Sequence, residues 1–189
     1  MYESGNIYNE VNTDIEYREQ GRTSSCFFTG HRKGLGNIIK DILPKMRSSI
    51  SFLYSKGVTD FYVGGALGFD TLAAAQILDM KRDHPNMKLI LYLPYTNQSE
   101  SWGADSKRYY EFLLKNADEI YYAFDGDIYD YEQAKKYLLM RNRLMADKCA
   151  YCIAFYLGNK RSGTGYTIEY AKKSDCEIIY LSDIRQNRK

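Results

Sequence analysis

Prolines, long apolar runs and an excess of one charge sign are scarce in this sequence. Among its 189 residues are three prolines, so the composition is neither collagen-like nor that of a Pro-rich disordered chain. No stretch approaches the roughly 18 consecutive apolar residues of a membrane span. The N-terminus has neither the basic start nor the apolar stretch of a signal peptide. We therefore expect a cytoplasmic protein with no membrane partner.

Acidic and basic residues nearly cancel. The 26 lysines and arginines against 24 aspartates and glutamates leave a formal net charge of +2. This charge supplies no broad positive field for binding a polyanion. The balance therefore disfavours nucleic acid as a partner, although it is compatible with a local basic patch.

The four cysteines all fall in or beside apolar runs, where free cysteine behaves as a small buried hydrophobe. We expect free thiols. Cys149 and Cys152 form a CxxC at the start of an expected strand, where side chains three apart would point to opposite faces. His31 has no second histidine nearby. We therefore expect no metal site and no cofactor, while the sequence leaves open a magnesium ion that arrives with a bound phosphate.

Short apolar runs alternate with longer amphipathic segments from Ser24 onward. The runs are near-continuous, as in a parallel sheet that helices cover on both faces. We predict an α/β fold, a Rossmann-like three-layer sandwich with a mainly parallel sheet of about six strands. The expected strands are SCFFT, DFYVGG, MKLILYLP, EIYYAF, AYCIAFYL and CEIIYL, and the expected helices span residues 37–56, 70–82, 105–117, 131–148 and 164–174.

This domain is expected over residues 23–184, after a flexible arm of residues 1–22 and before a basic tail of residues 185–189. Right-handed crossovers bring the ends of parallel strands to one edge of the sheet, and open α/β sheets bind ligands outside that edge. The loops that follow the strands are therefore the place to look for chemistry.

Glycines follow the first two expected strands. A glycine lets backbone amides approach a ligand, and an arginine suits phosphate or carboxylate, although a flexible turn with solvated cations explains the first loop equally well. The second loop, GGALGFD, opens a helix, where unpaired amides favour an anion. Its spacing is neither the Rossmann GxGxxG nor a Walker motif. The candidates for ligand or phosphate binding here are Thr29, Gly30, Arg32, Gly64, Gly65, Ala66, Gly68 and Asp70.

Asp70 and Trp102, in the loops after the second and third expected strands, each have two interpretations. Asp70 is either the N-cap of the helix or a contact to the ribose of the ligand. The loop after the third strand begins at Pro94, a further ligand-binding candidate, and contains Trp102. This tryptophan either covers a ligand ring or pins the loop to the core, and the second interpretation is favoured.

Arg141 and Arg143 lie in the expected helix 131–148. Residues two apart cannot share one helical face, so one arginine faces the cleft, and we expect it to bind an anion. The apolar residues that follow Arg143 favour a position near the core for that arginine. Asn142, between them, is a further ligand-binding candidate.

A second glycine-rich loop, GNKRSGTG, precedes the last helix. Two such loops on one sheet edge suit a nucleotide or dinucleotide. Glu169 follows, and it is either a site carboxylate or the partner of Lys173 in a helical pair. The ligand-binding candidates of this segment are Ser162, Gly163, Thr164, Gly165 and Thr167.

Three motifs together resemble the SLOG superfamily, which joins DprA/Smf proteins, LOG phosphoribohydrolases and small YpsA-like proteins of bacteria and phages. They are TGHR at 29–32, GGALGFD at 64–70 and P-Y-x-x-Q-x-x-x-W at 94–102, and they are most similar to the YpsA-like branch. The resemblance covers roughly residues 24–182. RNR at 141–143 resembles a DprA motif and, with the preceding methionine, the M-x-x-R of LOG enzymes.

The resemblance to LOG enzymes implies a candidate catalytic pair, Arg143 and Glu169. In those enzymes a PGGxGT loop followed by a glutamate, together with the helix arginine, hydrolyses the N-glycosidic bond of a nucleoside monophosphate. Such a glutamate would stabilise oxocarbenium charge or orient water. RSGTG at 161–165 departs from the Pro-Gly-Gly of that pattern. The same relatives imply a homo-oligomer, at least a dimer.

Three functions compete. The favoured one is binding of a nucleotide or nucleotide-derived ligand in the glycine-rich loops, with Arg32 and Arg143 as counter-charges, for sensing, sequestering or processing. The second is a phosphoribohydrolase that uses Arg143 and Glu169. The third is a module that binds single-stranded DNA, as DprA-like proteins do, or a partner protein.

Overall fold

The computed structural model describes residues 21–32, 34–36 and 38–182 of the chain. In this part, strands and helices alternate throughout, as the sequence predicts. The elements are β1 (Ser25–Gly30), α2 (Ile39–Ser55), β2 (Asp60–Val63), α3 (Phe69–Met80), β3 (Lys88–Leu93), α4 (Ala104–Asn116), β4 (Glu119–Tyr122), α5 (Tyr131–Lys148), β5 (Tyr151–Phe155), α6 (Gly163–Lys173) and β6 (Glu177–Tyr180).

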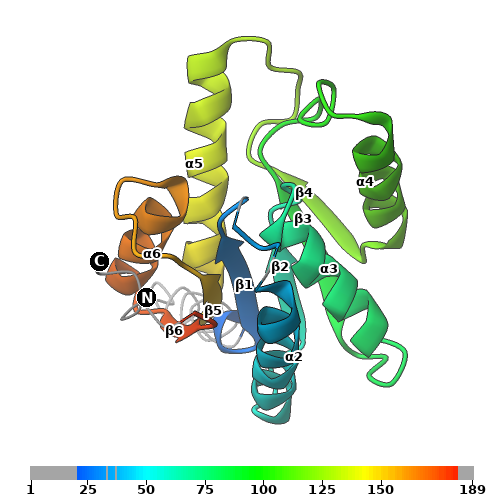
Figure 1. Cartoon of the computed structure of the whole chain (residues 1–189), viewed down its shortest axis with the longest axis vertical. Coiled ribbons are helices and arrows are strands. Elements are labelled where there is room, and N and C mark those ends of the chain that lie inside the picture. The colour runs from blue at the N-terminus through cyan, green and yellow to red at the C-terminus, as the bar shows by residue number, and fades with distance from the viewer. Residues whose placement is uncertain (1–20, 33, 37, 183–189) are drawn as a thin grey trace, which may run out of the picture.

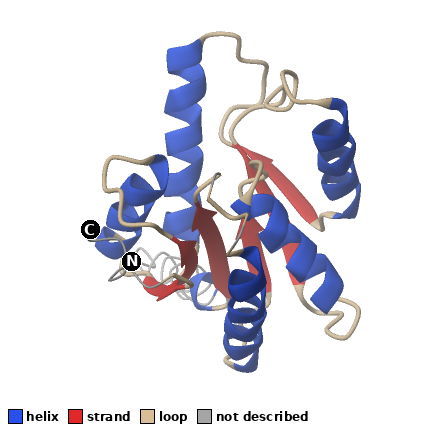
Figure 2. Cartoon of the chain, in the orientation of Figure 1, coloured by secondary structure: helices blue, strands red, loops and turns tan. Residues whose placement is uncertain are grey.

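All strand pairs of the sheet are parallel, in the order β4-β3-β2-β1-β5-β6. The predicted α/β fold is therefore confirmed. The chain winds outward from β1 to β4 and then returns to place β5 on the other side of β1. Since such crossovers are right-handed, this reversal puts α2, α3 and α4 on one face of the sheet and α5 and α6 on the other (Figures 1 and 2).

Each face of the sheet is sealed by its own apolar core. On one face, Ile50 of α2 and Ala73 of α3 pack against the strands, and on the other Met145 of α5 does so. The side chains of the central strand β1 alternate between the two cores. Phe28 packs in the first core, under α2 and α3, and Phe27 packs in the second core, under α5 and α6. Both faces of β1 are buried, which explains why its sequence is a continuous apolar run.

The four cysteines are free and buried, as expected. Cys149, Cys152 and Cys176 share the core under α5 and α6, so the expectation that the first two point to opposite faces is wrong. Cys149 follows the end of α5 and precedes β5, and the alternation of a strand does not apply to it. Burial raises the pKa of all four thiols. Within the described ranges, no group of three or more His, Cys, Asp or Glu side chains is placed to hold a metal ion.

Arg22 is part of the folded domain, whereas the sequence predicts that it belongs to the flexible arm of residues 1–22. Its carbonyl accepts a hydrogen bond from the amide of Ala150 at 2.9 Å, and its Nε donates to the carbonyl of Cys149 at 3.3 Å. The expected arm up to residue 20 and the expected tail at 185–189 lie outside the described residues. No helix in the described part is long and apolar enough to cross a membrane.

Candidate functional site

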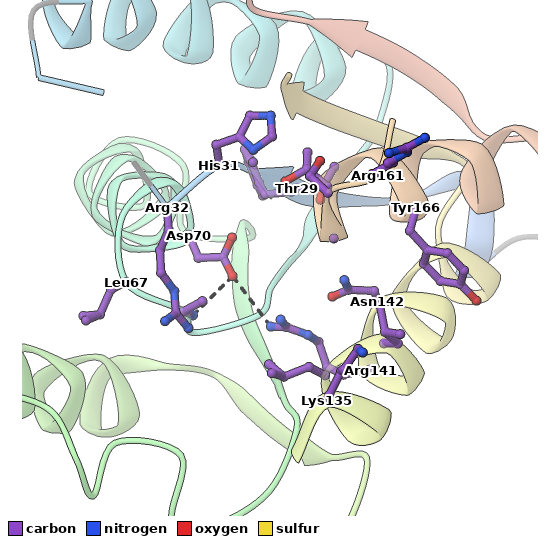
Figure 3. Close-up of a pocket in the computed structure, with 18 of the residues that line it drawn as sticks. Thr29, His31, Arg32, Leu67, Asp70, Lys135, Arg141, Asn142, Arg161 and Tyr166 are labelled. Atoms are coloured by element: carbon purple, nitrogen blue, oxygen red, sulfur yellow. Dashed lines mark hydrogen bonds and ion pairs between the residues drawn. The ribbon is translucent and has the colours of Figure 1, made fainter. Parts of the chain in front are cut away.

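A cavity of about 560 Å³ opens at the carboxyl edge of the sheet, beside the ends of β1 and β5. We call it the switch-point cavity, because the strand order reverses between these two strands, and open α/β sheets bind their ligands at such a point. The end of β1, the loops after β2 and β5 and one face of α5 form its walls (Figure 3). Helix α5 runs past the strand ends (Figure 1), and its exposed first half therefore supplies a side wall.

Arg141 is a buried cation in this cavity. It shares the buried face of α5 with Met145, one turn further on, and only 5% of its surface is exposed. Its Nη1 lies 3.6 Å from Oδ2 of Asp70, the ion pair marked in Figure 3. Neither Nε nor Nη1 has a hydrogen-bond partner among the described residues. Burial lowers the pKa of this guanidinium and the charge of Asp70 opposes the change, but an arginine stays protonated in either case.

Asp70 supplies the opposing carboxylate. It is 7% exposed, and its Oδ2 accepts a hydrogen bond from the amide of Ala66 at 3.2 Å. Burial raises the pKa of this carboxyl, while Arg141 and the amides of Ala66 and Gly64 oppose the rise. Gly68 is the N-cap of α3 and makes no side-chain cap bond, so the N-cap interpretation of Asp70 is wrong. Amides of this loop thus hold one of the protein's own carboxylates.

The glycines of that loop are required by packing within the protein. A Cβ at Gly64 would lie 1.5 Å from Nη1 of Arg141, so glycine alone lets the guanidinium approach Asp70. Gly68 has a φ of 92°, and a Cβ there would lie 2.6 Å from the carbonyl oxygen of Arg32. Side chains at both positions are excluded by geometry before any ligand is considered.

The loop after β5 presents the start of α6 to the cavity. Ser162 is the N-cap, and its Oγ accepts a hydrogen bond from the amide of Gly165 at 3.0 Å. Gly163 and Thr164 line the cavity at the positive end of the helix dipole, where the first amides of a helix lack intrahelical partners. Thr167 is buried and accepts from Nδ2 of Asn142 at 2.7 Å, which orients that amide.

Cations outnumber anions around the switch-point cavity. Arg32, Lys135 and Arg161 line it together with Arg141, against the single carboxylate of Asp70. Lys135 lies 3.9 Å from Glu132, whereas Arg32 and Arg161 form no ion pair with any described residue. The electrostatic balance favours a ligand with more than one negative charge.

His31 adds a polar group to the same wall. Its ring stacks on Tyr156 with centroids 5.9 Å apart, and burial lowers its pKa, which favours the neutral ring. Nε2 of His31 is buried and has no hydrogen-bond partner in the described part of the chain. A neutral imidazole with a free ring nitrogen can donate to or accept from a ligand.

A family model matches residues 24–184, which include every strand of the sheet and all the cavity walls. The chain belongs to the YspA SLOG family. This membership confirms the resemblance that the glycine-rich and Pro-Tyr motifs indicate.

Several relatives of this YspA SLOG protein come from Bacillus. The SPbeta prophage-derived protein YoqJ of Bacillus subtilis strain 168 is 36% identical over 122 residues, which cover 60% of this chain and 70% of YoqJ. A UPF0398 protein of Bacillus cereus strain G9842 is 27% identical over 146 residues, 77% of this chain and 75% of the relative. Another, from Bacillus cereus strain ATCC 14579, is 30% identical over 127 residues, 67% of this chain and 66% of the relative.

Most of the ligand-binding residues expected for this YspA SLOG chain come together. Those that line the cavity are Thr29, Gly30, Arg32, Ala66, Asp70, Arg141, Asn142, Ser162, Gly163 and Thr164. Those that are not among its lining residues are Gly64, Gly65, Gly68, Pro94, Gly165 and Thr167. Sequence reasoning missed Phe28, His31, Leu67, Tyr131, Lys135, Leu138, Leu139, Arg161 and Tyr166. The spacing of Tyr131, Lys135, Leu138 and Asn142 along one face of α5 was the signal that could have found the helical part.

The candidate catalytic pair lies outside the cavity. Arg143 donates to the hydroxyl of Tyr166 and lies over the Tyr166 ring, 5.3 Å from its centroid. Glu169 is exposed and accepts from Lys172 at 2.9 Å, rather than from the Lys173 that the sequence suggested. One arginine does face the cleft, as predicted, but it is Arg141, and the position assigned to Arg143 is wrong. The four-residue spacing from Arg141 to the buried Met145 was the overlooked signal.

The loop after β3 is tied to the core. Trp102 packs against the first core and meets Tyr110 edge-on, with ring centroids 5.3 Å apart. Gln98 is buried and donates to the Tyr110 hydroxyl at 2.8 Å. The favoured interpretation, in which Trp102 pins this loop, is therefore confirmed.

Proposed function

We propose that this YspA SLOG protein binds a nucleotide-type ligand through its phosphate groups in the switch-point cavity. The observation that carries the proposal is Arg141, which is 5% exposed and has two side-chain nitrogens, Nε and Nη1, without a hydrogen-bond partner among the described residues. A buried unsatisfied polar group costs about 1–3 kcal/mol, and more when it is charged. An oxyanion that accepts from Arg141 removes this cost, so binding is favoured.

The surroundings of Arg141 support phosphate in particular. Arg32 and Arg161 bring further positive charge to the walls, and Gly163 and Thr164, at the positive end of the α6 dipole, line the same cavity. Asp70 already balances part of the charge of Arg141. The remaining cations match a ligand with two or more phosphate charges, such as a nucleoside diphosphate or a dinucleotide.

Isothermal titration calorimetry with ADP and with inorganic pyrophosphate tests the proposal. We expect both to bind the wild type, and Arg141→Met to weaken both by about 30-fold or more, since truncating one partner of a buried charge contact costs about 2–5 kcal/mol. Arg108→Met is the matched control, because Arg108 is exposed on α4 and pairs with Asp105 away from the cavity. Folded wild-type protein that binds no nucleotide would refute the proposal.

Folding and binding must be separated in this experiment, because Arg141→Met leaves Asp70 without its ion pair. The double variant Asp70→Asn/Arg141→Met removes both charges of the pair and keeps the shape of the carboxyl. Circular dichroism establishes that each variant is folded before titration. Retained pyrophosphate binding in the folded double variant would contradict the role of Arg141.

Base release is the second readout, because the phosphoribohydrolase hypothesis requires it. Chromatography of nucleoside monophosphates after incubation with the protein detects any free base. Since Arg143 and Glu169 do not line the cavity, we expect binding without release. Release that is lost in Glu169→Gln would support the hydrolase instead.

A further inference from the structure

A second cavity, of about 390 Å³, lies between the loop after β3 and the segment that leads into α5. We call it the tyrosine cavity, because Tyr95, Tyr129 and Tyr131 line it. The side chains of Tyr129 and Tyr131 are unusually open for aromatic residues, at 80% and 76% exposure. Exposed aromatic rings at a cavity present π-faces on which a planar ligand can stack.

Hydrogen bonds between the two loops hold the walls of the tyrosine cavity in place. The side chain of Asn97 accepts from the amide of Ile128 at 2.9 Å and donates to its carbonyl at 3.3 Å. The amide of Thr96 donates to the carbonyl of Gly126 at 3.1 Å. Asp130 caps α5 by accepting from the amide of Gln133 at 2.8 Å. The cavity is therefore preformed, which lowers the entropic cost of filling it.

The tyrosine cavity has the opposite charge character to the switch-point cavity. Its lining includes the carboxylates of Glu100 and Asp130, and none of its described lining residues is a lysine or arginine. It is thus unsuited to phosphate. A carboxylate beside exposed aromatic rings suits a planar ring that carries N–H donors, because the ring can stack while its amino group donates to the carboxylate.

The two cavities share a wall. Tyr131 lines both of them, and Tyr95, in the tyrosine cavity, is close enough to Arg141 for its phenol to raise the pKa of the guanidinium. The second cavity therefore adjoins the cations of the first.

We propose that the tyrosine cavity receives the nucleobase of the ligand whose phosphates Arg141 holds, and that Glu100 selects bases with an exocyclic amino group. This inference rests on the proposed function. Oε2 of Glu100 accepts from Asn97 at 3.0 Å, which orients the carboxylate and leaves it further acceptor positions for the base. Tyr129, held beside the site by the clamped loop, supplies the stacking surface.

Comparing ADP, UDP and inorganic pyrophosphate by calorimetry tests this inference. ADP should bind the wild type about fivefold or more tightly than pyrophosphate, since stacking of one base typically contributes at least that factor. Tyr129→Ala should remove most of this advantage and leave the affinity for pyrophosphate unchanged. Tyr121→Ala is the matched control, because Tyr121 is an exposed tyrosine on β4 that lines neither cavity.

Base selectivity tests the role of Glu100. Uracil lacks an exocyclic amino group, so UDP should bind the wild type several-fold less tightly than ADP. In Glu100→Gln, the ratio of the ADP affinity to the UDP affinity should be smaller than in the wild type. An unchanged ratio would overturn the assignment to Glu100.

The outcomes separate this inference from the proposed function. Equal affinities for ADP and pyrophosphate, or a Tyr129→Ala variant that keeps full ADP affinity or weakens pyrophosphate equally, would overturn the tyrosine cavity as a base site. The phosphate site would still stand in those cases. Failure of both ADP and pyrophosphate to bind would instead refute the proposed function itself.

Discussion

The ion pair between Asp70 and Arg141 allows a quantitative prediction. At their separation of 3.6 Å, Coulomb's law with an effective dielectric constant of about 20 gives an attraction of about 5 kcal/mol. Removing both groups from water offsets much of this attraction. The pair as a whole therefore adds little to the free energy of unfolding. Removing only one of the two charges lowers that free energy strongly, because the other charge stays buried without a partner.

Arg141→Met alone should lower the free energy of unfolding by about 3–4 kcal/mol at pH 7. This loss of unfolding free energy is limited, because the carboxyl of Asp70, left without its ion pair, can take up a proton. Protonation at pH 7 costs about 1.4 kcal/mol for each pH unit above the ordinary pKa of 3.8, or about 4 kcal/mol. The double variant Asp70→Asn/Arg141→Met should lose clearly less than the sum of the two single variants.

Urea denaturation, monitored by circular dichroism, measures the coupling between Asp70 and Arg141. The four proteins compared are the wild type, Asp70→Asn, Arg141→Met and the double variant. Burial already raises the pKa of Asp70 in the wild type, and loss of Arg141 raises it further. The protonated carboxyl therefore stabilises the Arg141→Met fold fully below the unfolded pKa, and this contribution is lost as pH rises through the folded pKa. The destabilisation by Arg141→Met should consequently shrink from pH 7 toward pH 4. Additive effects within about 0.5 kcal/mol, or a loss independent of pH, would refute the reasoning.

Further predictions concern single positions. Gly64→Ala should abolish pyrophosphate binding, because the added Cβ would lie 1.5 Å from Nη1 of Arg141. Gly163→Ala should preserve the fold, because nothing lies within 4 Å of a Cβ at that position. Calorimetry measures pyrophosphate binding by the two variants, and thermal melts measure their stability. The ring of His31 should titrate below 6.5 by NMR, since burial lowers its pKa, so its contribution to stability is present above pH 6.5 and is lost as pH falls through the lowered pKa. A histidine signal that titrates normally in a His84→Gln background would contradict this. A thiol reagent should modify none of the four buried cysteines in the native protein and all of them after unfolding.

The order and type of the elements were readable from the sequence. The expected helix 131–148 coincides with α5, and the other boundaries agree within a few residues. These segments are predictable because a buried parallel strand must be apolar on both faces, while a helix that covers a sheet must be apolar on one. Differences are found at the ends, such as Arg22, whose guanidinium contacts residues far along the chain.

The site was only partly predictable. The loops after β1, β2 and β5 were identified because the carboxyl edge of a parallel sheet follows from its topology. The interaction of the Gly64–Gly68 loop with the carboxylate of Asp70 was not predicted, and binding of a ligand phosphate there stays a prediction. No sequence pattern indicated that Tyr129 and Glu100 line one cavity, because this cavity forms only when two loops, tied together by Asn97, fold against each other.

By itself, the sequence determined an α/β sheet, its family and the sheet edge on which the glycine-rich loops lie, because apolar periodicity and glycine-rich turns are local properties of the chain. Only the tertiary structure decided between Arg141 and Arg143, since the choice depends on which face of α5 meets the sheet. It also decided that Asp70 opposes Arg141, and that the two cavities share Tyr131. These outcomes depend on distances between segments far apart in sequence, which no local pattern encodes.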